Sequence, residues 1–96
     1  MKYGKVKREH GRVQGLDDLC NLIVKTIPSV TRIVPGRIKR RRGTGPAKLT
    51  LSYATDSGLK YIYSVGGTVQ ELFVVTGDAE TTQAAMRDLI KEQRLA

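Results

Sequence analysis

Residues 59–76 have the sequence LKYIYSVGGTVQELFVVT, and this stretch decides the fold. Apolar and polar side chains alternate up to Val65, which is the period-2 pattern of a strand with one covered face. Gly66 and Gly67 then supply the backbone freedom that a tight two-residue hairpin turn requires. Residues 68–76 form the most apolar strand-like segment of the chain. We therefore predict a β-hairpin whose second strand is covered on much of both faces.

Two further strands are predicted before this hairpin. Residues 48–55 alternate cleanly and are followed by Asp-Ser-Gly at 56–58, a combination typical of turns, so they predict a half-buried strand. Residues 30–39 are rich in β-branched side chains but are interrupted by Pro35 and Gly36. Proline removes a donor from the strand ladder, and the pair permits a bulge. This segment is therefore predicted to be an edge strand with a kink.

The segments on either side of these strands have helical periodicity. Apolar residues recur at helical spacing from Leu16 to Ile27, and Pro28 prevents continuation of that helix. Asp78 is a suitable N-cap for a second helix, which is predicted to extend to about Arg94. The predicted order is α-β-β-β-β-α. It corresponds to a two-layer α+β fold with an antiparallel four-stranded meander sheet and both helices on one face.

The length of 96 residues is that of one domain. Residues 1–14 are basic and have no sustained apolar period, so we predict an N-terminal arm followed by a single α+β domain over residues 15–96. Apolar runs such as residues 72–75 are far shorter than the ~20 residues of a membrane span, and the N-terminus lacks the apolar core of a signal peptide. A single thiol, Cys20, fits a reducing compartment. These features predict a cytoplasmic protein.

The formal net charge of +8 is unevenly distributed. Residues 1–48 contain 13 lysines and arginines and three acids, whereas residues 49–96 contain four and six. A charge excess that served solubility alone would have no reason to segregate. The asymmetry predicts a basic binding face on a nearly neutral scaffold.

The strongest concentration of charge is GRIKRRRGTGPAK at residues 36–48, which has six cations and no acid. Arginine suits bidentate phosphate contacts, and the glycines allow close backbone approach. We predict a nucleic-acid-binding protein, with RNA favoured over DNA, that acts as an accessory factor in a larger assembly. The predicted phosphate contacts are Arg37, Lys39, Arg40, Arg41, Arg42, Thr44 and Lys48 in this segment, and Lys5, Lys7, Arg8 and Arg12 in the arm.

Other interpretations of these residues remain open. The basic segments could bind an acidic protein partner or could be solvated surface. Tyr61 and Tyr63 could stack on bases, but their apolar neighbours favour a place in the core. Glu71 stands among apolar residues of its strand and is expected to form an ion pair with a cation of a neighbouring strand. The chain has no pairing of a nucleophile with a base, so no catalytic residue is predicted.

The only soft metal ligands are His10 and Cys20, whose spacing matches no recognised zinc motif. His10 could be joined by Glu9, Asp17 or Asp18, although acids at the start of a helix are already explained by the helix dipole. Cys20 lies on the apolar side of the predicted first helix, where a small buried hydrophobe is the ordinary interpretation.

Five segments resemble a small uncharacterised prokaryotic family described as predicted metal-binding proteins. They are Gly15-Leu16, IVPGRI at 33–38, the strand entry at 46–51, Gly-Leu-Lys at 58–60, and above all GTVQELFVVT at 67–76. The resemblance implies that the chain binds a metal ion. It makes a divalent metal the alternative to nucleic acid, with His10 and Cys20 as the candidate ligands.

A second, local likeness is to the translation initiation factor 1 type domain. Its late portion also has Gly-Gly-Thr-Val, a strand, Gly-Asp and a helix, which correspond here to residues 66–69 and 77–78. This likeness implies the ribosome or RNA as a partner.

Overall fold

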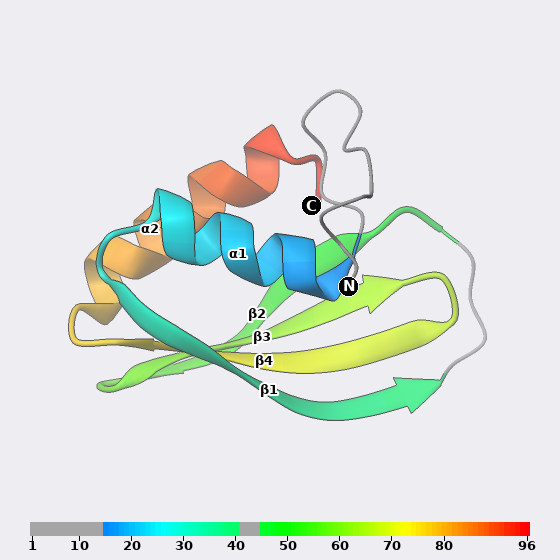
Figure 1. Cartoon of the computed structure of the whole chain (residues 1–96), viewed down its shortest axis with the longest axis horizontal. Helices are drawn as coiled ribbons and strands as arrows, with labels where there is room; N and C mark the ends of the chain where they lie inside the picture. The colour runs from blue at the N-terminus through cyan, green and yellow to red at the C-terminus, as the bar shows by residue number, and fades with distance from the viewer. Residues whose placement is uncertain (1–14, 41–44) are drawn as a thin grey trace.

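The computed structural model describes residues 15–40 and 45–96 (Figure 1). The predicted arm, residues 1–14, lies outside them. The elements are α1 (Leu16–Thr26), β1 (Val30–Arg40), β2 (Lys48–Thr55), β3 (Gly58–Val65), β4 (Thr68–Thr76) and α2 (Ala79–Glu92). This order confirms the predicted α-β-β-β-β-α arrangement and the α+β class.

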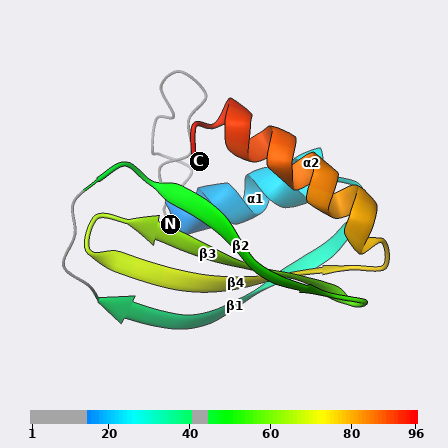
Figure 2. The same ribbon diagram turned by 180° about the vertical axis from the view of Figure 1, so that it is seen from behind.

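The four strands form one antiparallel sheet in the order β1-β4-β3-β2. Tight turns join β2, β3 and β4 into a meander, and β1 pairs with the free side of β4. The apolar strand β4 is therefore central, as its sequence predicts, and β1 and β2 are the two edges. Both helices lie on the same face of this sheet (Figures 1 and 2). The opposite face is called the outer face below.

The predicted kink in β1 is a bulge. Pro35 pairs with Leu72 but Ile38 pairs with Gln70, so two residues of β1 oppose Glu71. Side chains of β4 stabilise this bulge from both faces of the sheet. Glu71 Oε1 accepts a hydrogen bond from the Arg37 backbone N–H (3.1 Å), and Gln70 Nε2 donates to the Gly36 carbonyl (2.8 Å).

The core lies between the helices and the inner face of the sheet. Tyr61 and Tyr63 are buried there, which confirms the core interpretation and removes both rings as base-stacking groups. Val65, expected on the same face, is 42% exposed because β3 ends there at the hairpin. The remaining buried apolar residues come from both layers and include Leu19, Ile23, Leu59, Leu72, Val74, Met86 and Leu89.

A buried hydroxyl cluster ties α2 to the sheet. The Thr82 hydroxyl is 2.6 Å from that of Ser29 and 2.8 Å from that of Thr76. Thr76 Oγ1 also donates to the Ser29 carbonyl and accepts from the Asp78 N–H. Each hydroxyl therefore has a partner, as burial of a polar group requires.

The helix ends follow the predicted signals. Asp78 caps α2 by accepting a hydrogen bond from the Thr81 N–H (3.1 Å). The Thr81 side chain, and after it the Thr81 backbone N–H, lowers the pKa of the Asp78 carboxyl by hydrogen bonding. The helix ends at Glu92, and Arg94 adopts the left-handed conformation (φ 57°) that turns the chain. The Leu95 carbonyl then accepts from the Leu49 N–H (2.7 Å), which binds the chain end to β2.

Candidate nucleic-acid interface

The described cations of the basic segment lie at one end of the sheet. In an antiparallel sheet of this order, the end of β1 and the start of β2 lie at the same end as the β3–β4 hairpin (right in Figure 1, left in Figure 2). Arg37, Lys39 and Arg40 come from β1 and Lys48 from β2, and all four are exposed. The structure therefore brings together the four predicted contacts that it describes. Arg41, Arg42, Thr44 and the arm residues Lys5, Lys7, Arg8 and Arg12 lie outside the described residues.

The cations of β1 and Lys48 of β2 lie on opposite edges of the sheet. Three strand spacings separate β1 from β2, which is about 14 Å. Lys39 pairs with Val69 and Lys48 with Ser64, which in turn pairs with Val69, so both lysines share the outer face. Arg40 is the next residue after Lys39 and stands on the other side of β1. The positive charge therefore extends across the width of the sheet end.

A row of interacting residues, one from each strand, crosses the outer face. The Lys60 Nζ lies 5.5 Å from the centre of the Tyr53 ring and 3.2 Å from Glu71 Oε2. Glu71 Oε1 reaches the Arg37 backbone of β1. The row thus contains a cation–π contact, an ion pair and a charge-assisted hydrogen bond. It confirms the ion pair predicted for Glu71 and identifies its partner as Lys60.

The Glu71 carboxyl stays ionised in this row. The hydrogen bond from the Arg37 N–H lowers its pKa most, and the bond from Lys60 lowers the pKa further. Because an ionised carboxylate only accepts hydrogen bonds, Glu71 presents acceptor oxygens beside the cations of the outer face.

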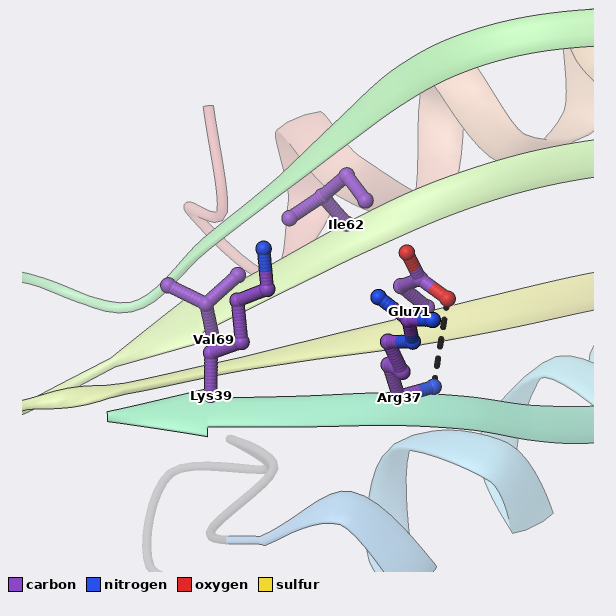
Figure 3. Close-up of a pocket in the computed structure, with 5 residues that line it drawn as sticks. All are labelled: Arg37, Lys39, Ile62, Val69 and Glu71. Atoms are coloured by element: carbon purple, nitrogen blue, oxygen red, sulfur yellow. Dashed lines mark hydrogen bonds between the residues drawn. The ribbon is translucent and has the colours of Figure 1, made fainter. Parts of the chain in front are cut away.

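Beside this row, the outer face has a cleft with a volume of about 460 Å³. Figure 3 shows its five lining side chains, which come from β1, β3 and β4: Arg37, Lys39, Ile62, Val69 and Glu71. The volume lies in the range of 300–1,000 Å³ that is typical of small-molecule sites. The cleft therefore combines two cations, one anion and an apolar floor.

The sequence predicted the cations of the basic segment as site residues but missed the other members of the cleft. Alternation places Val69 and Glu71 on one face of their strand. Glu71 pairs with Ile62 of β3. This pairing depends on the register of β3 against β4, which is set by the Gly66-Gly67 turn. Counting residues outward from that turn along both strands would have placed Ile62 opposite Glu71, and the sequence contained no other indication of it.

The described residues do not fit a metal centre. Cys20 is half-buried, and desolvation, followed by the negative charge of Asp17, raises the pKa of its thiol to about 11. A metal ligand must lose its proton, so a raised pKa makes this thiol a weaker ligand than an exposed cysteine. Within residues 15–40 and 45–96, no three or more His, Cys, Asp or Glu residues are grouped so that they could hold a metal ion. His10 lies outside these residues.

In the part of the chain that the structure describes, neither helix is long and apolar enough to cross a membrane.

Comparison with known families identifies the chain. A family model described as "Predicted metal-binding protein (DUF2103)" matches residues 1–92, so the chain belongs to this family and the predicted resemblance is confirmed. Searches of curated proteins and of solved structures returned no match. The family description supports the metal-binding alternative of the sequence analysis and provides no support for nucleic-acid binding.

Proposed function

We propose that this member of the predicted metal-binding family binds nucleic acid, with RNA as the favoured form, through the cationic end of its sheet. The observation that carries the proposal is the convergence of Arg37, Lys39, Arg40 and Lys48 at one sheet end, from both edge strands. In the sequence, the segment between these strands adds two more arginines and no acid.

A phosphate backbone is a suitable counterpart for charge in this arrangement. The ~14 Å between the sheet edges is longer than the spacing of neighbouring phosphates on one strand, so cations at both edges could contact different phosphates of the same strand. Exposed lysines and arginines gain affinity mainly by releasing the counterions of those phosphates. Binding of this kind requires no base readout.

Salt dependence tests this proposal. The affinity for a single-stranded RNA should fall linearly on a log-log plot against salt concentration. Replacing Lys39 and Lys48 by glutamine should reduce the slope of that plot by about 0.7 for each cation removed, which is the value for single strands. Fluorescence anisotropy at several salt concentrations measures both quantities.

The matched control is Lys25→Gln, which removes one exposed lysine from the helix layer. This variant should keep most of the wild-type slope, because the lysine is remote from the sheet end. An equal loss of slope in the control would mean that net charge alone drives binding and would overturn the proposed interface. Recovery of an acidic protein partner that survives nuclease treatment would support the adaptor interpretation instead.

Binding of a divalent metal is the second candidate function, and the family match favours it. On this hypothesis, protein purified without an affinity tag contains stoichiometric metal by elemental analysis, and His10→Ala loses it. Cys20→Ser should leave the metal content unchanged, because Cys20 is half-buried on α1 and belongs to no group of three metal-ligating residues among those the structure describes. A substoichiometric metal content that His10→Ala does not alter would contradict this candidate function.

A further inference from the structure

The chemistry of the outer-face cleft restricts what can occupy it. A simple anion would use Arg37 and Lys39 but would gain nothing from Ile62 and Val69. A purely apolar ligand would gain nothing from the two cations or from the remaining acceptor sites of the Glu71 carboxylate. The lining therefore matches a ligand with three parts, namely an anionic group, an apolar face and a hydrogen-bond donor. A nucleotide unit of a single strand has all three.

Glu71 determines which base such a unit would carry. Oε1 of Glu71 accepts the bond from the Arg37 N–H, and Oε2 contacts Lys60 Nζ. A carboxylate offers about four lone-pair sites in all. The carboxylate can therefore accept two more hydrogen bonds. Guanine presents two adjacent donors on its Watson–Crick edge, N1–H and the N2 amino group. Adenine and cytosine each place an acceptor nitrogen beside a single amino group on that edge, which an ionised carboxylate would repel.

We propose that this cleft is a base-recognition subsite for guanine in single-stranded nucleic acid. The inference rests on the proposed function, because the sheet end must first hold the phosphate backbone. The base lies over Ile62 and Val69, and its adjoining phosphate lies within reach of Arg37 and Lys39. Glu71 accepts hydrogen bonds from guanine N1–H and N2–H. It is a specificity-determining residue, and Lys60 and the Arg37 backbone position it.

Oligonucleotides that differ at one base test the subsite without altering the protein. The probes are uridine octamers with a single central guanine, hypoxanthine, adenine or abasic site. The guanine probe should bind about 5- to 150-fold more tightly than the adenine probe, which is the discrimination typical of one bidentate contact. Hypoxanthine keeps N1–H but lacks the N2 amino group, so its affinity should be intermediate.

Glu71→Gln provides the test on the protein side. Glutamine can still accept the Arg37 N–H bond, but its amide presents a donor in place of one acceptor. The preference for guanine should disappear, while affinity for the uridine background should stay the same or increase. Glu80→Gln removes an equal charge from an exposed site on α2 and should leave the preference intact.

The outcomes separate the two proposals. Salt-dependent binding of all probes with equal affinity would overturn the guanine subsite and leave the proposed function standing. Absence of binding to every probe would overturn both. If Glu71→Gln unfolds the bulge, the hypoxanthine and adenine probes still decide the question with the wild-type protein. A dimer that occupies the outer face and is not dissociated by the guanine probe would also overturn the subsite.

Discussion

Replacement of Leu72 by alanine is expected to lower the free energy of unfolding by about 2–5 kcal/mol. Leu72 lies on the central strand β4, faces the helices and is fully buried. Truncation removes its apolar surface from the core and leaves a cavity that neighbouring residues can close only in part. Domains of this kind have about 5–15 kcal/mol of stability, so the loss is a large fraction of the total. Urea denaturation followed by circular dichroism measures it.

Ile38→Ala is the control for this substitution. Ile38 is also an aliphatic residue of the sheet, but it lies on the edge strand β1 and is 64% exposed. Its truncation should change the free energy of unfolding by less than about 0.5 kcal/mol, as at most surface positions. Equal losses for the two variants would show that the core does not lie where the structure places it.

Gly58→Ala is expected to lower the free energy of unfolding by about 1–3 kcal/mol or more. A Cβ at this position would lie 2.4 Å from the Val74 carbonyl oxygen and 2.7 Å from the Phe73 ring. The ring could rotate, but the carbonyl belongs to the neighbouring strand, so β3 and β4 would have to separate locally. The midpoint of urea or thermal unfolding measures the loss.

Gly77→Ala is the matched control for the glycine substitution. A Cβ on Gly77 would meet no described atom within 4 Å, and its backbone is not left-handed. The substitution should be neutral or slightly stabilising, because alanine reduces the freedom of the unfolded chain. Similar destabilisation in both variants would contradict the close approach of β3 and β4 at Gly58.

Local patterns were sufficient to predict most of the fold. The alternation in residues 48–55 and 59–65, the apolar strand 68–76 and the Asp78 cap each predicted an element that the structure confirms. These signals depend on neighbours within a few residues, so one sequence contains them. The pairing of β1 with β4 joins residues that are 28 to 46 positions apart in the sequence, and no local pattern specifies it.

The candidate site was predictable only in part for the same reason. Basic composition identified Arg37, Lys39 and Lys48 as cations of one segment. It could not show that they occupy opposite edges of the sheet, or that Ile62 of β3 pairs with Glu71 of β4 in the cleft.

The sequence by itself determined the elements, their order, the core face of β3 and the segregation of charge, because periodicity and turn chemistry act locally. Only the tertiary structure decided that β1 joins the free side of β4, which places the cations at both edges of one sheet end. It also decided that Tyr53, Lys60, Glu71 and the Arg37 backbone form a row across the outer face. Such contacts depend on strand register and long-range packing, which are properties of the whole chain.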